Sequence, residues 1–172
     1  SEWTGFRDLD EMTAHAQAFH DFWDAHKAEG GTDVEWYRRF PKERVARQLW
    51  FNMAAPYKRR MTESIINAVV KDRPLSILDF GCGIGIPAFA LAQKGHQVTA
   101  MDIAGTGTFE FLKWRTKEHG VEMTFADSPG GVPHLGGQQF DIIIAMDCLE
   151  HLPEWRRTLH ELVAHLKPAG VL

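Results

Sequence analysis

Cysteine is scarce in this chain of 172 residues, and it has neither a long apolar stretch nor a surplus of positive charge. Its two cysteines, Cys82 and Cys148, are too few for a secreted scaffold held by disulfides, and they fit the reduced thiols of an intracellular compartment. No apolar run approaches the roughly 18 residues of a membrane-spanning helix, and no signal peptide is recognisable. The formal net charge of −4 disfavours broad attraction to nucleic acid or to a membrane surface. We therefore expect a cytoplasmic protein with no membrane partner.

The chain divides into two regions of different character. Hydrophobic residues make up 44% of it, which is enough for a substantial core. Residues 1–74 show helical periodicity without strand patterns, whereas residues 75–172 alternate strand and helix patterns. We expect a helical cap followed by an α/β core.

Three helices are expected in the cap. The first ends at Gly30-Gly31, the second has Pro41 in its first turn, and the third follows Pro56 and runs to Arg73-Pro74. Apolar residues at helical spacing would form their buried faces: Met12, Ala16, Phe19 and Trp23, then Val45, Leu49 and Met53, then Met61, Ile65 and Val69.

A strand pattern that breaks into alternate glycines is the most informative segment. Ile77–Phe80 has strand character, glycine follows at positions 81, 83 and 85, and Ile86–Ala92 has helix character. Glycine permits positive φ and lets a ligand lie against bare backbone. The N-terminus of the helix would offer free N–H groups and a positive dipole end to an anionic group. The segment therefore predicts a site for a nucleotide-type cofactor.

The spacing of these glycines distinguishes between cofactors. The dinucleotide fingerprint G-x-G-x-x-G requires a glycine where Ile86 stands. The pattern present, D-x-G-x-G-x-G over residues 79–85, resembles motif I of the class I S-adenosylmethionine (SAM) methyltransferases. A nicotinamide-dependent oxidoreductase remains an alternative, favoured only by the acid Asp102, which either family places after its second strand.

Four later signals follow in the order that this resemblance implies. Gln97–Asp102 reads as a strand ending in a carboxylate, and Val121–Ala126 as a strand followed by Asp127 and Ser128. The unbroken apolar run that ends at Asp147 indicates a buried parallel strand, and it leads into residues 149–152, similar to the family's "LEHL". Residues 166–172 are similar to its "LKPGG" turn into a fifth strand.

The resemblance implies a Rossmann-like α/β sheet with strand order 3-2-1-4-5-7-6, the last strand being antiparallel. The chain supplies strands one to four and the start of strand five, so we expect the C-terminal strands to be missing. An open apolar edge invites pairing with another chain. We therefore expect either a truncated protein or self-association through that edge.

The resemblance also assigns a cofactor site. The glycines would shape the turn around the methionine half, Asp102 would bind the ribose hydroxyls, Asp127 would face the adenine, and the backbone at Met146 would run beside the sulfonium. The expected cofactor-binding residues are Asp79, Gly81, Cys82, Gly83, Gly85, Asp102, Ile103, Asp127, Ser128 and Met146. For two of them another role is open: Asp79 would organise the glycine turn instead of touching the ligand, and Asp127 would cap a loop.

The chemistry expected of the protein is limited, because SAM already carries the electrophilic methyl group. The enzyme must align a nucleophile with the methyl–sulfur bond, and a hydroxyl acceptor would also benefit from a base. We expect His151 to be that base, close to Asp147 at the end of the fourth strand. The alternative is a histidine that makes a local hydrogen bond at a helix start.

Asp147, Glu150 and His151 form D-x-x-E-H, which is similar to the E-x-x-E-H metal cluster of some ubiquinone-pathway O-methyltransferases and small-RNA 3′-end methyltransferases. Two carboxylates and an imidazole on one turn could hold a divalent cation. Aspartate replaces glutamate at the first position, which shortens its reach, and no fourth ligand is identifiable. We expect no metal.

Eight basic residues lie between Arg38 and Arg60 against one acid, with aromatics interleaved. One interpretation is a solvated helical face, and the other is a site for an anionic substrate or for stacked bases of a nucleic acid. Tyr57, Trp50 or one of the arginines would then reach the carboxylate of SAM.

We conclude that the sequence predicts a SAM-dependent methyltransferase that acts on a small-molecule acceptor, O- or N-methylation being undecided, and releases S-adenosylhomocysteine (SAH). A non-catalytic or truncated SAM-binding protein is the main alternative, and a nucleic-acid methyltransferase is a weaker one.

Overall fold

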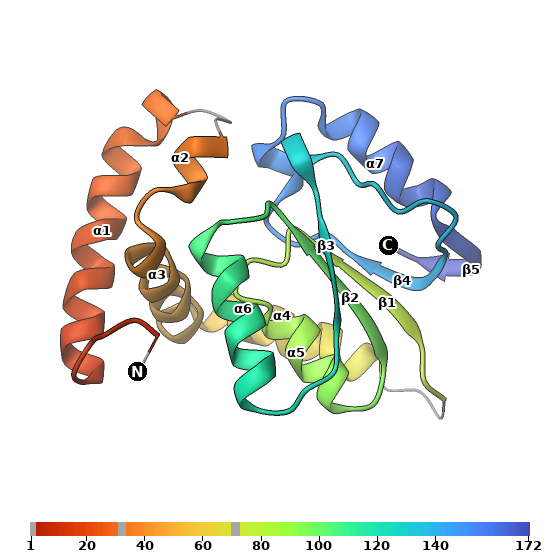
Figure 1. Cartoon of the computed structure of the whole chain (residues 1–172), viewed down its shortest axis with the longest axis horizontal. Coiled ribbons are helices and arrows are strands. Elements are labelled where there is room, and N and C mark those ends of the chain that lie inside the picture. Colours follow the sequence, from red (N-terminus) through yellow and green to blue (C-terminus); the bar gives the residue numbers. More distant parts are fainter. Residues whose placement is uncertain (1–2, 31–33, 70–72) are drawn as a thin grey trace.

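The computed structural model describes residues 3–30, 34–69 and 73–172, which form a parallel sheet flanked by helices (Figure 1). The sheet has the order β3-β2-β1-β4-β5. Its strands are β1 Ser76–Phe80, β2 Gln97–Asp102, β3 Thr124–Asp127, β4 Phe140–Ile144 and β5 Leu166–Val171. This order agrees with the first five strands that the resemblance implied.

Helices cover both faces of the sheet. The helices α4 Pro56–Ala68, α5 Ile86–Gln93 and α6 Gly107–Glu118 lie on one face, and α7 Trp155–Ala164 lies on the other (Figure 1). Alternation along β1 divides the core accordingly, because successive side chains of a strand point to opposite faces. Ile77 packs in the cluster that contains Phe89 and Leu112 of α5 and α6, whereas Leu78 packs with Leu162 of α7.

The N-terminal region is helical, as expected. Its helices are α1 Leu9–Gly30, α2 Val34–Arg38 and α3 Pro41–Ala54. Pro41 and Pro56 occupy the first positions of α3 and α4, where a missing N–H leaves no hydrogen bond unmade. The helix α1 packs along α3, and Ala16 is fully buried between them.

Three details of the helical cap differ from the sequence expectations. The five-residue α2 was not expected, because it is too short to show a period. Met53 and Met61 are 52% and 36% exposed, so they do not belong to the buried faces of α3 and α4. The helix α4 ends at Ala68, before the expected end at Arg73-Pro74, and both Gly31 and residues 70–72 lie outside the described residues.

The last strand is longer than expected. The strand runs from Leu166 to Val171 and pairs with β4 at these two residues, although the segment was expected to turn before entering a strand. A register shift lies between Phe140 and Ile142 of β4, and Ala169 has a φ of 65°. Between the two paired residues of β5, residues 167–170 lie opposite the single residue Asp141 of β4, so a large bulge interrupts the ladder. Two other strands are shorter than expected: β3 begins only at Thr124, and β4 already ends at Ile144.

A third buried cluster joins the cap to the core. Val45 of α3 is fully buried against Phe111 of α6 and against Ile84, which lies within the glycine turn. Trp3 completes one side of this cluster and lies edge-on to Phe111 with ring centroids 5.4 Å apart. The cap therefore rests directly on the segment that was expected to bind the cofactor.

None of the helices in the described ranges is long and apolar enough to cross a membrane.

Candidate functional site

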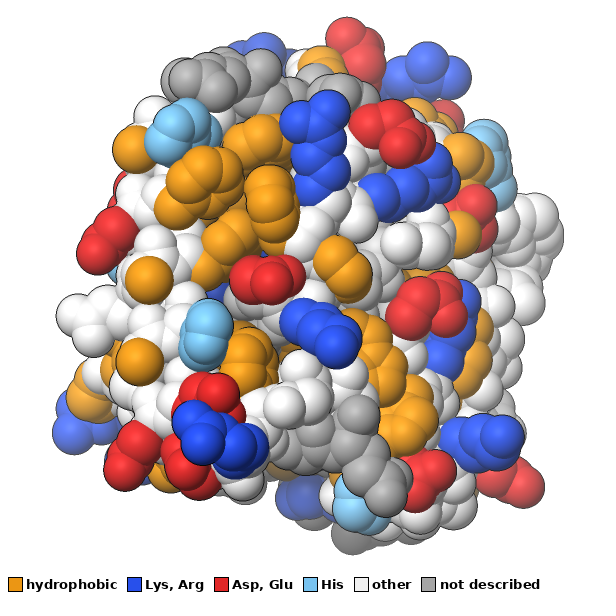
Figure 2. All heavy atoms as spheres, turned by 60° about the vertical axis from the view of Figure 1, so that its left-hand side comes forward, with side chains coloured by type: hydrophobic (Ala, Val, Ile, Leu, Met, Phe, Trp, Pro, Cys, Tyr) orange, Lys and Arg blue, Asp and Glu red, His pale blue; other side chains and the backbone are white. Residues whose placement is uncertain are grey.

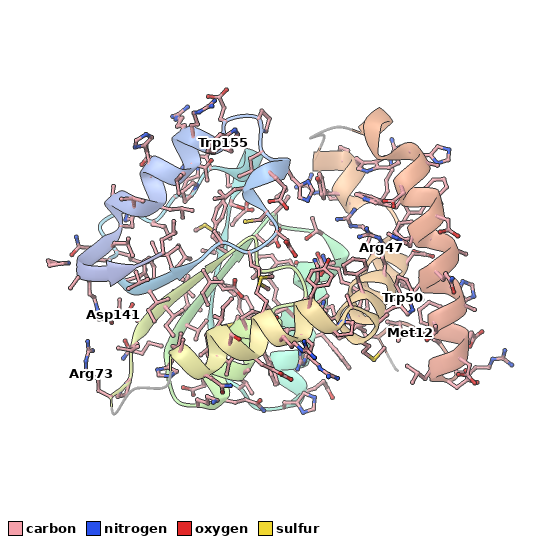
Figure 3. All side chains as sticks on the ribbon, turned by 180° about the vertical axis from the view of Figure 1, so that it is seen from behind. Met12, Arg47, Trp50, Arg73, Asp141 and Trp155 are labelled. Carbon is pink, nitrogen blue, oxygen red and sulfur yellow. The ribbon has the colours of Figure 1, made fainter. Side chains whose placement is uncertain are left out.

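A cavity of about 750 Å³ opens between the helical cap and the carboxyl ends of the central strands. The core contributes residues 80–84, 102–103, 146–148 and 150–153 to its wall, and α3 and its neighbours contribute the opposite side. Parallel strands in register place their carboxyl ends at one edge, which is where ligands bind in open α/β sheets. The volume is in the usual range for a small-molecule site. Figure 3 shows Arg47 on the cap side of this region.

A second hollow, of about 710 Å³, lies at the opposite edge of the sheet, beside Ser76, Gln97 and Phe140 at the amino ends of their strands. Neither the glycine turn nor the acids expected at strand ends line it. The cavity at the carboxyl ends is therefore the candidate functional site.

The glycine turn adopts the conformation that its sequence predicted. Gly81, Gly83 and Gly85 have φ values of 67°, 54° and 65°, in the left-handed region that favours glycine. A Cβ built on Gly81 would lie 2.5 Å from the Cβ of Cys148. The turn thus passes so close to the segment after β4 that a side chain has no room.

Asp79 organises this turn from below instead of facing the cavity. Its carboxylate is 3% exposed and accepts the backbone N–H of Ala88 in the first turn of α5 at 3.2 Å. Burial raises the pKa of Asp79 to about 7, with the Ala88 hydrogen bond opposing the shift. The expectation that the start of α5 presents free N–H groups to a ligand is therefore wrong for Ala88, and Pro87 has none to give.

Asp102 ends β2 at the wall of the cavity. Its two oxygens accept the N–H groups of Gly83 and Ile103, each at 2.7 Å. Burial raises the pKa of Asp102, and these two hydrogen bonds act in the opposite direction. Since each carboxylate oxygen has two acceptor positions, the group can still accept two hydroxyls from a ligand.

The structure divides the expected cofactor residues into two sets. Those that line the cavity are Gly81, Cys82, Gly83, Asp102, Ile103, Ser128 and Met146. Those that do not are Asp79, Gly85 and Asp127. Gly85 instead faces Leu112 of α6, and Asp127 is exposed and accepts the N–H of Ala104 at 2.9 Å.

Asp147 lies on the cavity wall directly after β4, in a left-handed conformation with a φ of 51°. Non-glycine residues seldom adopt this conformation, aspartate and asparagine more often than others, and strained backbone of this kind is enriched at functional sites. Its carboxylate accepts a hydrogen bond from Lys58 of α4, whose ammonium lies 4.7 Å from the ring centre of Phe51. The contact connects the cap to the core across the mouth of the cavity.

The D-x-x-E-H residues are not gathered into a metal site. His151 Nε2 lies 3.8 Å from Glu150 Oε1, while Asp147 is engaged by Lys58. In the part of the chain that the structure describes, no group of three or more His, Cys, Asp or Glu residues is placed to hold a metal ion. All three residues line the cavity, so His151 is within the site where a base was expected.

Gln48 of α3 was missed by the sequence interpretation. Its Oε1 accepts the N–H of Ile84 at 3.1 Å, and a Cβ built on Gly83 would lie 2.7 Å from the same oxygen. The side chain thus closes the cap over the glycine turn. A glutamine inside an amphipathic helix gives no signal of such a contact, because the contact depends on how the helix docks.

The basic stretch between Arg38 and Arg60 separates into two groups. Arg44, Arg47 and Lys58 line the cavity, whereas Arg59 and Arg60 are exposed on α4. On the face around α1, lysines and arginines are interspersed with acidic side chains (Figure 2). The interpretation as a solvated face thus holds for Arg59 and Arg60, whereas Arg44, Arg47 and Lys58 face the cavity, and binding of an anion there stays a prediction.

A family model for the methyltransferase domain matches residues 35–172. The chain therefore belongs to the methyltransferase domain family, and its fold is the Rossmann-like fold of SAM-dependent methyltransferases. The matched range begins within the helical cap, so it includes α3 and α4 as well as the sheet.

Among curated proteins, the chain is similar to ubiquinone biosynthesis O-methyltransferases. The protein of Rickettsia felis is 35% identical over 98 residues, which are 56% of this chain and 39% of that protein. The protein of Salmonella paratyphi A is 33% identical over 97 residues, which are 55% and 39% of the two chains. This chain thus covers well under half the length of these relatives.

Solved structures agree in fold. Coclaurine N-methyltransferase bound to N-methylheliamine and SAH matches with a TM-score of 0.56 at 19% identity, over 66% of this chain and 34% of that one. The glycopeptide N-methyltransferase MtfA complexed with SAM matches with a TM-score of 0.53 at 18% identity, over 64% and 50%. The [4+2]-cyclase SpnF matches with a TM-score of 0.59 at 25% identity, over 66% and 43%.

Proposed function

We propose that this protein transfers the methyl group of SAM to a small-molecule acceptor bound between the helical cap and the sheet. The observation that carries the proposal is a glycine turn and an acid, Asp102, on the wall of one cavity in a methyltransferase-family chain. The cavity is roofed by α3 and α4, and an enclosed site suits a small acceptor better than a macromolecule.

The residues present fit SAM. Asp102 retains acceptor positions for two ribose hydroxyls, and the bare backbone at Gly81 and Gly83 leaves room for the methionine half. Ser128 would lie near the adenine, with Asp127 behind it. SAM supplies an electrophilic methyl group on a sulfonium when it is bound.

The chain's own residues orient the acceptor and handle its proton. The walls exclude water and hold the acceptor in line, and such alignment lowers a barrier by up to roughly 7–11 kcal/mol. His151 accepts the proton of a hydroxyl acceptor at its free ring nitrogen, which is worth a factor of about 10²–10⁴. The names of the similar curated proteins favour O-methylation over N-methylation.

Three further statements belong to the same proposal. The free thiols of Cys82 and Cys148 suit a reducing compartment, so the cytoplasm is the proposed location. The mixed charges around α1 disfavour a nucleic-acid substrate. The reaction needs no divalent cation, since its chemistry is supplied by the sulfonium and a base.

The main competitor is a protein that binds SAM without transferring its methyl group. The match to the [4+2]-cyclase SpnF favours it, because one fold supports unrelated chemistry. Turnover separates the two. We expect SAH to accumulate with at least one member of a panel of small hydroxyl-bearing acceptors, whereas SAM binding without SAH release over the whole panel would support the competitor.

The deciding experiment is calorimetric titration with SAM, SAH and NADH, each with and without magnesium. Binding of SAM and SAH, but not NADH, is expected. Binding of NADH alone would overturn the assignment and restore the oxidoreductase alternative. A requirement for magnesium in SAH binding or in turnover would contradict the metal-free reaction.

A further inference from the structure

Two arginines of the cap face the cavity from α3. Arg44 and Arg47 are three residues apart in the helix, so they share one face, and both line the cavity wall. Figure 3 labels Arg47 on α3. Neither is needed for the cofactor contacts described above, which are made by the glycine turn and Asp102. Their role is therefore open.

Arg44 is held among aromatic rings and is poorly hydrated. Its guanidinium carbon lies 4.4 Å from the ring centre of Trp23 and 4.8 Å from that of Tyr37. Its Nε is buried and has no hydrogen-bond partner among the described residues. Burial lowers the pKa of Arg44 to about 10, so the side chain is still charged at neutral pH. A buried donor without a partner is rare in folded proteins, and here it adjoins an open cavity.

Arg47 has a similar setting. Its guanidinium carbon lies 5.7 Å from the ring centre of Trp23 and 6.0 Å from that of Phe51, and its Nε donates to Nδ1 of His20 at 3.2 Å. Burial lowers the pKa of Arg47 as well. Two partly desolvated cations that lie close together repel each other, and an anion bound between them offsets this repulsion.

Two acids on the cavity wall act on this pair from a distance, since Asp102 raises the pKa of Arg44 and Asp24 raises that of Arg47, but neither effect offsets the lowering by burial. The acids on the wall are engaged by other groups: Asp102 by backbone N–H groups, Asp147 by Lys58, Asp24 by His20 and Glu150 by His151. Within the described ranges, neither Arg44 nor Arg47 forms an ion pair with a carboxylate. The cationic pair is thus complementary to an anion that enters the cavity.

We propose that Arg44 and Arg47 bind a carboxylate of the methyl acceptor, and that the acceptor is therefore an aromatic acid. This inference rests on the proposed function and adds the substrate class to it. A guanidinium presents a planar fork of donors that matches a carboxylate in a two-point contact. The rings of Trp23, Tyr37 and Phe51 form the neighbouring wall, against which a flat aromatic acceptor packs. The other carboxylate that enters this cavity is that of SAM, and the test separates the two.

The test is calorimetric titration of the protein saturated with SAH. The probes are 4-hydroxybenzoate and its neutral isostere 4-hydroxybenzamide. We expect the acid to bind at least about tenfold more tightly than the amide. Arg44→Gln and Arg47→Gln should each weaken binding of the acid about tenfold, while the affinities for the amide and for SAH stay within about twofold. Arg44→Lys, which keeps the charge and loses the fork, should give an intermediate loss.

Arg39 supplies the matched control. Its guanidinium carbon lies 5.9 Å from the ring centre of Trp36, but it does not line the cavity. Arg39→Gln should therefore leave both probes unaffected. Should Arg44→Gln fail to fold, as judged by circular dichroism, Arg47→Gln and the comparison of acid with amide on the unaltered protein decide the question.

Three results would overturn the inference. They are equal affinity for acid and amide, no binding of the acid to a protein that binds SAH, and a loss of SAH affinity in the arginine variants as large as the loss for the acid. The last result would assign the arginines to the carboxylate of the cofactor. Failure of the unaltered protein to bind SAH would instead overturn the proposed function itself.

Discussion

Asp102, the last residue of β2, accepts the backbone N–H of Gly83 at 2.7 Å across the edge of the sheet. The acid proposed to bind ribose is therefore also part of the glycine turn, and the two features form one unit. A substitution at Asp102 should consequently remove a ligand contact and loosen the turn that faces the methionine half of SAM.

We predict that Asp102→Ala weakens SAH binding at least tenfold, about 1.4 kcal/mol. Calorimetric titration measures the loss. Glu110→Ala, which removes an acid from the exposed side of α6, is the control and should bind SAH normally. Unchanged affinity in Asp102→Ala would show that the ribose lies elsewhere.

Gly85→Ala should destabilise the fold more than Gly95→Ala does. Both glycines have positive φ, 65° and 86°, so both variants carry backbone strain. Only at Gly85 would the new Cβ also meet a core side chain, Leu112, at 2.3 Å. Overpacking of a core costs about 1–3 kcal/mol, so the free energies of unfolding of the two variants should differ by that amount. Urea denaturation measures it, and equal midpoints would mean that Leu112 moves aside freely.

Asp79→Asn should change how stability depends on pH. Burial raises the pKa of Asp79 to about 7 in the folded protein, whereas in the unfolded chain it is about 4. Between about pH 4 and pH 7 the folded protein therefore keeps a proton on Asp79 that the unfolded chain has released. The contribution of Asp79 to the free energy of unfolding is thus fully present below pH 4 and is lost as the pH rises to 7. Asparagine stays neutral and keeps an acceptor for the Ala88 N–H. The variant should therefore gain stability relative to the unaltered protein as the pH rises from 4 to 8.

Urea unfolding at a series of pH values tests this prediction, with Glu118→Gln on the exposed surface of α6 as the control. Parallel pH profiles for Asp79→Asn and the unaltered protein would contradict it.

Asp141→Asn should change the pH dependence of the free energy of unfolding in the opposite direction. The Asp141 carboxylate accepts the Ser76 N–H at 2.9 Å and bonds to Lys167 and Arg73, and these contacts hold its pKa well below the usual range. The stabilisation that the Asp141 carboxylate contributes is present above pH 4 and is lost as the pH falls through the pKa of Asp141 in the folded protein. The variant should be less stable at pH 7, and the difference should narrow in acid. Figure 3 shows this contact at the end of the sheet remote from the cap, so SAH binding should be unaffected.

Arg73→Met is the matched partner substitution, since the Arg73 side chain is 67% exposed. Exposed ion pairs contribute only about 0–1 kcal/mol, so this variant should behave almost like the unaltered protein. A destabilisation equal to that of Asp141→Asn would show that Arg73, and not the Ser76 N–H, dominates.

His151→Gln should lower kcat for a hydroxyl acceptor by about 10²–10⁴, without changing the affinity for SAH. His151 lines the cavity, whereas His160 is exposed on α7 and supplies the control, His160→Gln. A fall in kcat below twofold would leave His151 with a structural role only.

The sequence predicted the parts of this structure that depend on local pattern. The positions of β1, α5 and β2 followed from apolar runs and from glycine spacing, and their parallel order followed from the family resemblance. It assigned Asp102 to the ribose but left Asp79 with two possible roles, contact with the ligand or organisation of the glycine turn, because both are acids near the end of an apolar strand. Burial separates them: one caps α5 beneath the turn, and the other faces the cavity.

The contribution of the cap to the site was the least predictable feature. Gln48, Arg44 and Arg47 take their roles from the way α3 docks on the glycine turn, and no periodicity encodes docking. The path of β5 could not be predicted for a related reason, because its bulge depends on the register with β4. The proline and glycine in this segment read locally as a turn.

The buried contact between Val45 and Ile84 means that cap and glycine turn are thermodynamically linked. A ligand that binds the ordered turn more tightly than the disordered one must stabilise the closed cap by the same free energy, and the reverse holds equally. Swinging the cap away to admit a ligand would bring Ile84, now 2% exposed, into water. A displaced cap would therefore also loosen the glycine turn that is proposed to hold the cofactor.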